Sequence, residues 1–248
     1  MTRRRTGKGG EMFRNSVMIA LAVACVAGSG ALAQRLTPQV PDPSKFPPLA
    51  PPTPLFFRLE WTRTPLQHPV TQADLANQAL ELKLYGPSGK DILTASSGAP
   101  SMTGGSPPHL FTGMCERTCA AAFRDPKNFV DLSGLGKIRW NTKVSGLHRI
   151  HPIIKLADGR WLLGEHEDGN LLDFHPSEFT LAESRWIALD TDLVVTRGNW
   201  LDRSAVDLTK VDEVGFTDLM PGSGHGDGGF SDMGWIEVYG KPVPRTSR

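Results

Sequence analysis

The sequence has few cysteines, no long hydrophobic run and almost no excess of either charge. It contains 3 cysteines in 248 residues, and its formal net charge at pH 7 is +1. The longest apolar stretch, residues 17–26, is about half as long as a membrane-spanning helix must be. A nucleic-acid-binding protein needs a basic face, and a peripheral membrane protein bound through charge needs a polybasic patch. We therefore expect neither nucleic acid nor a lipid surface as a partner.

The common catalytic and cofactor motifs are absent as well. The glycine-rich segment 221–232 (PGSGHGDGGFSD) is followed by no Gly-Lys-Ser/Thr and lies in no βαβ pattern. Its Gly222-Ser223-Gly224 stretch lacks the spacing of a G-x-S-x-G nucleophile elbow. There is no H-E-x-x-H zinc helix and no C-x-x-C-H haem site. No cofactor is therefore expected, and no motif favours an enzyme class.

The N-terminus has the three parts of an export signal. Five basic residues precede or flank the start of the apolar run: Arg3, Arg4, Arg5, Lys8 and Arg14. Ala31-Leu32-Ala33 fits the small-residue cleavage pattern, so residues 1–33 are predicted to be a signal peptide, with Gln34 the first mature residue. The alternatives are an uncleaved anchor, a lipid on Cys25, and the twin-arginine route. We expect a periplasmic or secreted protein with no transmembrane segment after cleavage.

Removal of the signal peptide would leave two cysteines, Cys115 and Cys119. In an oxidising compartment such a pair predicts a local disulfide, and two buried thiols are the alternative. The C-x3-C spacing fits no common zinc pattern. Because the leader is basic, the remainder of the chain is expected to be mildly acidic.

The rest of the chain divides into three segments. Residues 34–54 contain eight prolines and are predicted to be an extended linker. Residues 55–242 are predicted to form one domain, and residues 243–248 a tail.

Alternation of hydrophobic and polar residues begins at residue 55 and indicates strands with one buried face. Strands are predicted at residues 55–64, 80–84, 138–144, 150–156, 161–165, 179–181, 186–189, 211–217 and 235–239. Asp158-Gly159 predicts a hairpin with a type I′ turn, and residues 71–78 one or two helical turns capped by Thr71. This pattern predicts an all-β fold: a jelly-roll β-sandwich of two antiparallel sheets with few or no helices.

Two short motifs support the same fold. Residues 131–140 (DLSGLGKIRW) resemble the entry to a core strand in jelly-roll domains of the galactose-binding-like group. That group includes the complex I intermediate-associated type and some carbohydrate-binding modules. Residues 211–216, followed by residues 236–240 (IEVYG), resemble the closing strand pair of these domains. The resemblance covers residues 128–241 at most, and implies binding of a sugar or another small polar ligand, usually without catalysis.

The densest polar cluster is Glu165, His166, Glu167 and Asp168. On a strand, Glu165 and Glu167 would share one face, and His166 would lie on the other. Paired carboxylates can hydrolyse glycosides when their spacing is right, but no known sandwich-hydrolase pattern is present. We interpret the cluster as a polar hairpin end, with contact to a sugar or to calcium as the functional alternative.

The glycine-rich segment is the second candidate, through His225, Asp227 and Asp232. It is predicted to be either a mobile surface loop or a loop that gates a ligand. Asp227 and Asp232 are the candidate metal ligands, and a structural calcium ion is the metal considered. His148, His151, His166 and His175 are interpreted as scattered surface residues.

The six tryptophans are the third candidate, since indole rings stack on sugars. At least four are expected in the core. Trp200, in a turn predicted at residues 198–200, is expected to be the most exposed. The sequence thus predicts an exported, non-catalytic binding module for carbohydrate. One alternative is a hydrolase that uses Glu165, Glu167 and Asp168, with His225 and Asp227; the other is a structural or assembly protein of the cell envelope.

Overall fold

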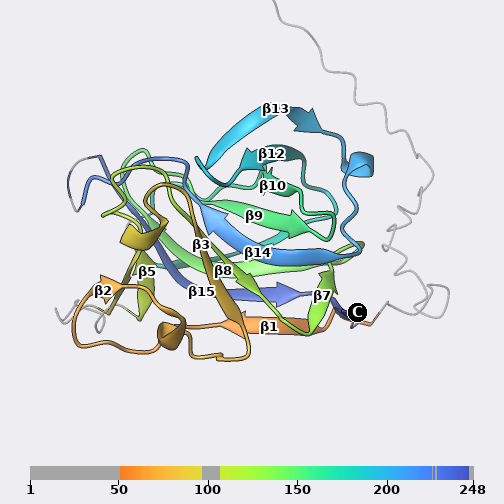
Figure 1. Ribbon diagram of the computed structural model, residues 1–248, viewed down its shortest axis with the longest axis horizontal. Helices are drawn as coiled ribbons and strands as arrows, with labels where there is room; N and C mark the ends of the chain where they lie inside the picture. Colours follow the sequence, from red (N-terminus) through yellow and green to blue (C-terminus); the bar gives the residue numbers. More distant parts are fainter. Residues whose placement is uncertain (1–50, 97–106, 172, 225, 227, 246–248) are drawn as a thin grey trace, which may run out of the picture. The chain divides into compact units, whose positions relative to one another are not determined.

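Two antiparallel β-sheets make up the part of the chain that the computed structural model describes: residues 51–96, 107–171, 173–224, 226 and 228–245 (Figure 1). The seven-stranded sheet consists of β1 (Leu55–Leu59), β2 (His68–Pro69), β4 (Leu93–Ala95), β5 (His109–Phe111), β8 (Lys137–Val144), β11 (His175–Thr180) and β15 (Ser231–Tyr239). The nine-stranded sheet consists of β3 (Glu81–Tyr85), β6 (Ala120–Arg124), β7 (Asn128–Asp131), β9 (His151–Leu156), β10 (Trp161–Gly164), β12 (Trp186–Asp190), β13 (Val195–Leu201), β14 (Val211–Thr217) and β16 (Lys241–Pro244). The predicted β-sandwich is confirmed. The predicted signal peptide and residues 34–50 of the predicted linker lie outside the described residues.

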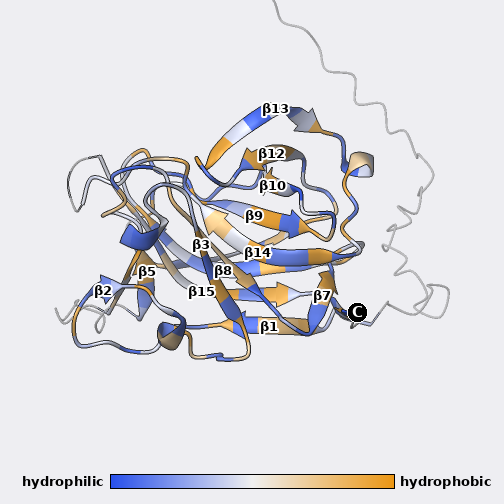
Figure 2. Ribbon diagram, viewed as in Figure 1, coloured by the Kyte–Doolittle hydropathy of each residue, from blue (hydrophilic) through white to orange (hydrophobic). Residues whose placement is uncertain are grey.

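The alternation predicted from the sequence is clearest in β8. Ile138, Trp140 and Val144 are fully buried, whereas Arg139 between them is partly exposed. Both hydrophobic and hydrophilic residues accordingly appear along most strands (Figure 2). The inward side chains of the two sheets form one continuous core, whose largest fully buried side chains include Trp140, Trp186, Phe123 and Phe216. Burying each such ring stabilises the fold by about 1.5–3 kcal/mol.

A second, smaller hydrophobic cluster lies on the opposite face of the nine-stranded sheet. Its buried members are Ala120, Ala122, Ile153, Leu163, Ile187, Leu189 and Val194. Strand β6 contributes to both clusters, since Ala121 and Phe123 face the main core while Ala120 and Ala122 face the second one. This strand is therefore covered on both faces.

The hairpin between β9 and β10 is confirmed, but its turn is not of type I′. The Gly159 N–H donates to the Leu156 carbonyl at 2.9 Å, and Gly159 has a φ of +92°. Asp158 has no positive φ, whereas a type I′ turn requires one at both central residues. The geometry is that of a type I turn followed by a left-handed glycine, which explains why glycine occupies this position.

Helical structure in the described residues is limited to three single 3₁₀ turns: Gln72–Asp74, Gly89–Asp91 and Arg203–Ala205. The first replaces the one or two turns predicted over residues 71–78. Its Asp74 carboxylate accepts hydrogen bonds from the Thr71 N–H at 2.7 Å and from the Thr71 hydroxyl at 2.9 Å. No helix in this part of the chain is long and apolar enough to cross a membrane.

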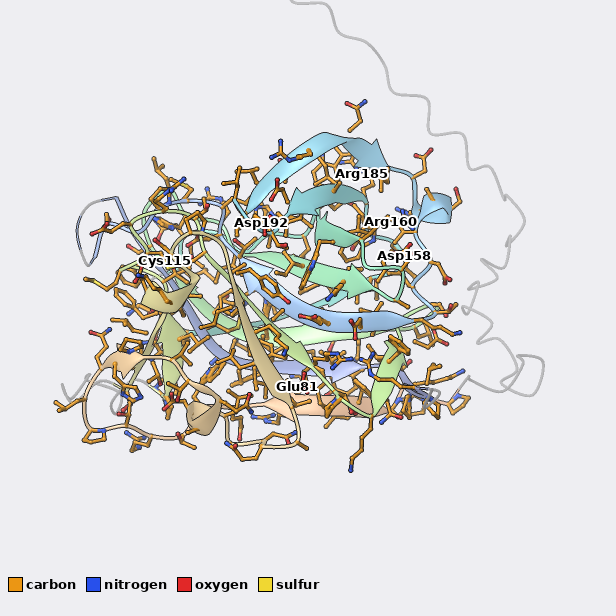
Figure 3. The ribbon with its side chains drawn as sticks, in the orientation of Figure 1. Glu81, Cys115, Asp158, Arg160, Arg185 and Asp192 are labelled. Atoms are coloured by element: carbon orange, nitrogen blue, oxygen red, sulfur yellow. A yellow bond between two sulfur atoms is a disulfide. The ribbon has the colours of Figure 1, made fainter. Side chains whose placement is uncertain are left out.

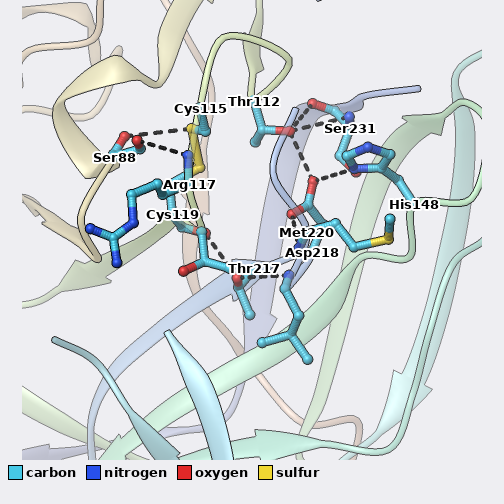
Figure 4. Close-up of a disulfide and its surroundings, with 12 residues drawn as sticks. Ser88, Thr112, Cys115, Arg117, Cys119, His148, Thr217, Asp218, Met220 and Ser231 are labelled. Carbon is cyan, nitrogen blue, oxygen red and sulfur yellow. Dashed lines mark hydrogen bonds and ion pairs between the residues drawn. A yellow bond between two sulfur atoms is a disulfide. The ribbon is translucent and has the colours of Figure 1, made fainter. Parts of the chain in front are cut away.

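The predicted disulfide is confirmed, and it lies beside the glycine-rich segment (Figure 4). The Gly222 N–H donates to the carbonyl of Cys115 at 2.7 Å, and the Gly224 N–H donates to the carbonyl of Gly113 at 2.7 Å. A Cβ atom at Gly222 would lie 2.3 Å from the Gly113 carbonyl oxygen, so only glycine permits this approach. The Cys115–Cys119 loop thus holds the start of the glycine-rich segment.

The two motifs behind the family resemblance lie on structural strands. Residues 131–140 run from the end of β7 into β8, and residues 236–240 include the end of β15. The predicted closing strands, β14 and β15, lie in different sheets and do not hydrogen-bond to each other.

Candidate ligand-binding depression

A depression of about 390 Å³ opens where the chain crosses from the seven-stranded to the nine-stranded sheet. Strand β11 and the connection to β12 supply five of its residues, and the segment after β10 supplies two. The lining residues are Glu165, His166, Glu178, Phe179, Thr180, Glu183 and Ser184. Two of the four residues in the predicted polar cluster therefore line one site.

Glu165 is held at this site by Arg185. Strand β10 ends at Gly164, so the prediction that Glu165 and Glu167 share a strand face is wrong. The Glu165 carboxylate accepts hydrogen bonds from the Arg185 N–H at 2.9 Å and from Arg185 Nε at 2.7 Å. These bonds, first from the backbone and then from the side chain, lower the pKa of Glu165.

Arg185 also connects the depression to Trp200. Its guanidinium lies 5.3 Å from the centroid of the Trp200 ring, beside β12 and β13 (Figure 3). Trp200 is 43% exposed, as predicted, but it lies in strand β13 and not in a turn. Trp200, Arg185 and Glu165 therefore form a continuous surface that leads into the depression.

His166 and Asp168 form the support behind the depression. The His166 ring stacks on Phe179 with centroids 3.8 Å apart, and its Nε2 lies 3.2 Å from Asp168 Oδ1. The buried Asp168 carboxylate also accepts hydrogen bonds from Trp140 Nε1 at 2.8 Å, Thr142 Oγ1 at 2.6 Å and Ser177 Oγ at 2.9 Å.

These contacts decide the charge of Asp168. Burial opposes its ionisation, but the hydrogen bonds from His166, Thr142 and Ser177 outweigh burial and lower its pKa. With its oxygens occupied by donors from the chain itself, Asp168 positions His166 and is not among the residues that line the depression.

Glu167 lies apart from the depression. Its carboxylate is 3.8 Å from Arg149 Nε and 3.9 Å from His151 Nε2. Burial lowers the pKa of His151. The predicted Glu165/Glu167/Asp168 group is therefore divided among the depression, an exposed pair and the buried support.

Of the three candidate residues in the glycine-rich segment, the structure describes only Asp232. His225 and Asp227 lie outside the described residues. Asp232 is buried at the start of β15 and is not among the residues that line the depression. Within the described residues, no group of three or more His, Cys, Asp or Glu side chains is arranged to hold a metal ion. The predicted Asp227/Asp232 metal pair stays a prediction.

Other tryptophans and histidines differ in part from expectation. Trp61, Trp140 and Trp186 are buried in the main core, whereas Trp161 and Trp235 are only partly buried. Three tryptophans, and not four, are therefore fully core residues. His148, predicted to be a surface residue, is buried, with Nδ1 2.9 Å from Asp218 Oδ2 (Figure 4).

Sequence reasoning missed Glu178, Phe179, Glu183, Ser184 and Arg185. A polar stretch between two predicted strands was visible at residues 182–185, but such stretches separate most strands. Residues 182–185 are part of a site because they connect two different sheets. The local pattern of hydrophobic and polar residues does not reveal that connection.

No family model matches the chain, and no curated protein matches it. Three solved structures that match the chain are a family 11 carbohydrate-binding module from Clostridium thermocellum in complex with a β-1,3-1,4-mixed-linked tetrasaccharide, PfGH50B, and an exo-β-agarase. The module is 14% identical with a TM-score of 0.37, over 72% of this chain and 98% of the module.

The two larger proteins match over only part of their length. PfGH50B is 12% identical with a TM-score of 0.37, over 67% of this chain and 24% of its own. The exo-β-agarase is 9% identical with a TM-score of 0.39, over 71% of this chain and 25% of its own. At these identities and TM-scores, the matches assign neither a family nor a ligand to this chain.

Proposed function

We propose that this chain is an exported, non-catalytic module that binds carbohydrate in the depression beside Trp200. The observation that carries the proposal is the continuous surface formed by the exposed Trp200 indole, the Arg185 guanidinium and the Glu165 carboxylate at the depression's edge. A sugar ring has an apolar C–H face and a rim of hydroxyl groups. The indole can stack on the apolar C–H face, and the guanidinium and carboxylate groups can hydrogen-bond to the hydroxyl groups.

The lining of the depression suits a ligand with many hydrogen-bond donors. Three carboxylates and two hydroxyl groups line it, and no lysine or arginine does. The Ser184 hydroxyl donates to the Thr180 carbonyl at 3.0 Å, so it presents lone pairs to a ligand. The volume of about 390 Å³ lies within the usual range for small-molecule sites.

The side chains of this surface are held by contacts within the chain itself. Arg185 is held by Glu165, and His166 is held between Phe179 and Asp168. A preorganised surface loses less side-chain entropy on binding, which favours affinity for a weakly interacting polar ligand. The Cys115–Cys119 disulfide supports an oxidising compartment, and hence export.

Nothing in this geometry favours hydrolysis over binding. A glycosidase needs one carboxyl group with a raised pKa to protonate the leaving group. The pKa values of Glu165 and Asp168 are both lowered, and Glu167 lies elsewhere. Hydrolysis of a polysaccharide that is abolished by the Glu165→Gln, Glu167→Gln double change would contradict the proposal.

The test is a binding survey with the chain from residue 34 to residue 248. We expect retention on at least one soluble polysaccharide in affinity electrophoresis, followed by calorimetry with an oligomer of the same sugar. Trp200→Ala should weaken binding roughly tenfold, since stacking on one ring contributes about 1.4 kcal/mol.

Trp161→Ala and Trp235→Ala are matched controls, because both indoles are partly exposed and neither is among the residues that line the depression. Unchanged binding is expected for both. Loss of binding in either of them, with Trp200→Ala unaffected, would place the ligand on a sheet face and overturn the assigned site. Co-purification with an envelope complex and no retention on any polysaccharide would favour the structural role.

A further inference from the structure

Strand β13 contains a bulge near its end. Two pairs of opposite residues on β12 and β13 define it: Ala188 with Arg197, and Trp186 with Leu201. One residue of β12 lies between these pairs, whereas three residues of β13, 198–200, lie between them. Two extra residues therefore leave the regular ladder, which is the property of a β-bulge.

Gly198 gives this bulge its backbone conformation. Its φ is +76°, in the left-handed region that favours glycine. A Cβ atom at Gly198 would have no other atom within 4 Å, whereas a Cβ atom at Gly215 would lie 2.1 Å from a backbone carbonyl oxygen. Glycine is therefore favoured at position 198 by the backbone angle and not by crowding.

A regular β13 would not expose Trp200 in the same way. Without the two extra residues, the same flanking pairs would place Trp200 directly opposite Ile187, and opposite residues in an antiparallel pair share one face of the sheet. Ile187 is a buried member of the second hydrophobic cluster, so the indole would pack on that cluster. In the bulged strand Trp200 is 43% exposed.

Protection of a sheet edge does not by itself account for the exposed indole. Strand β13 is an edge strand of the nine-stranded sheet, and bulges often keep such edges from pairing with other chains (Figure 1). Edges protected in this way usually expose charged residues or proline, because exposed apolar side chains promote association. Here the bulge ends at a tryptophan, and the Arg185 guanidinium lies over its ring, 5.3 Å from the centroid.

We propose that Gly198 is a positioning residue for the ligand-binding surface: the bulge that it permits turns Trp200 out of the ladder and presents its indole to a sugar. This inference rests on the proposed binding of carbohydrate beside Trp200. Because Arg185 lies over one face of the indole, the sugar stacks on the other face. Bulges beside functional sites commonly redirect a side chain in this way.

The first test measures the exposure of Trp200 and needs no sugar. Three variants of the full mature chain are compared: Gly198→Ala, Gly198→Asn and deletion of residues 198–199. All carry Trp161→Phe and Trp235→Phe, which leaves Trp200 as the exposed indole beside three buried ones. The deletion should at least halve the quenching of tryptophan fluorescence by iodide. Gly198→Ala should also lower it, because alanine disfavours a φ of +76°, and Gly198→Asn should retain most of it, because asparagine tolerates that angle.

The second test measures binding by affinity electrophoresis in gels of laminarin, xyloglucan, galactomannan or soluble starch. The deletion should raise the dissociation constant about tenfold, as expected when stacking on one ring is lost, and Gly198→Ala about threefold. Gly159→Ala is the matched control, since Gly159 has a φ of +92° and equally open space around its Cβ position. Both alanine variants should lower the melting temperature by about 3–6 °C, but Gly159→Ala should leave quenching and retention unchanged.

Two results would overturn the inference: undiminished iodide quenching in the deletion variant, or retention that the deletion leaves intact while Trp200→Ala weakens it. Equal losses of quenching in Gly198→Ala and Gly198→Asn would also contradict it, because the backbone angle would then not be the cause. If none of the four polysaccharides retains the unmodified chain, the proposed function is what fails, and the quenching series still decides whether the bulge presents Trp200.

Discussion

Asp168 packs against the seven-stranded sheet and Asp232 belongs to it; both are buried, yet their surroundings are opposite. The Asp168 carboxylate accepts hydrogen bonds from three strand residues, Trp140, Thr142 and Ser177, and its pKa is lowered. Asp232 Oδ1 accepts none, and the pKa of Asp232 is raised to about 7. Burial acts against ionisation in both, so the donors and not the depth decide the charge.

The difference separates two roles within one sheet. A carboxylate whose lone pairs are all engaged is rigid and can orient a neighbour, as Asp168 orients His166 at the depression. A buried carboxylate with an unengaged lone pair retains affinity for a proton, which is consistent with the raised pKa of Asp232.

The largest effect is expected from Asp168→Asn. An amide replaces one acceptor oxygen with an NH2 donor, which would face the donors of Trp140 and Thr142. We expect the free energy of unfolding to fall by about 3 kcal/mol at pH 7, measured by urea denaturation. The control, Asp158→Asn at the exposed hairpin tip (Figure 3), should change it by less than about 0.5 kcal/mol. Equal losses in the two variants would show that the hydrogen bonds of Asp168 have no special weight.

The second-largest effect is expected from Asp232→Asn, which should raise the free energy of unfolding and not lower it. Because the folded-state pKa of Asp232 is raised to about 7, the folded chain binds a proton that the unfolded chain has lost above about pH 4. The stability that this group contributes is complete below pH 4 and is lost as the pH rises to 7. The variant cannot ionise, so relative to the unmodified chain it should gain about 2 kcal/mol between pH 5 and pH 8 in the presence of EDTA.

Asp192→Asn is the control for this pH series, since Asp192 is exposed (Figure 3). Its free energy of unfolding should differ from that of the unmodified chain by less than about 0.5 kcal/mol throughout the series. A constant difference for Asp232→Asn as well would mean that the Asp232 carboxyl has an ordinary pKa, and the contrast with Asp168 would disappear.

The sequence predicted the strands that have one buried and one exposed face, and it also predicted β14, which is buried along nearly its whole length. Strand β8 alternates because Trp140 faces the core and Arg139 faces solvent. Strand β6 (AAAFR) was not predicted, because it is covered on both faces and has no period of two. Strand β13 (VTRGNWL) was not predicted for the reverse reason: it is an edge strand with almost every side chain exposed. Hydrophobic periodicity is most informative for strands between these extremes.

The site was predictable only in part for a related reason. Glu165, His166 and Trp200 stood out by residue type and do lie on one surface. Glu183 and Arg185, which complete that surface, lie in a connection whose role depends on which sheets it joins. The sequence likewise singled out both Asp168 and Asp232, but the donors of Asp168 are up to 28 positions away in the chain. Local pattern therefore identified the carboxylates and could not tell which one is satisfied.

The smallest effect is expected from Ser177→Ala. This variant removes one hydrogen-bond donor from Asp168 and so makes its surroundings more like those of Asp232. The variant removes one hydroxyl donor, at 2.9 Å from Asp168 Oδ2, and leaves those of Trp140 and Thr142. We expect a loss of about 1.5 kcal/mol at pH 7 in urea denaturation, the usual contribution of a hydrogen bond to a buried charge. Since the bond lowers the pKa of Asp168, its contribution is present above the ordinary aspartate pKa and is lost as the pH falls.

The stability loss in Ser177→Ala should therefore become smaller as the pH falls. The stability gain in Asp232→Asn should also become smaller as the pH falls. Ser133→Ala is the matched control, since the Ser133 hydroxyl donates to the exposed Asp131 carboxylate at 2.6 Å. It should cost less than about 0.5 kcal/mol at every pH, because water replaces the lost donor. A pH-independent loss in Ser177→Ala would instead indicate a packing defect, and would remove the claim that the count of donors sets the charge state of a buried aspartate in this sheet.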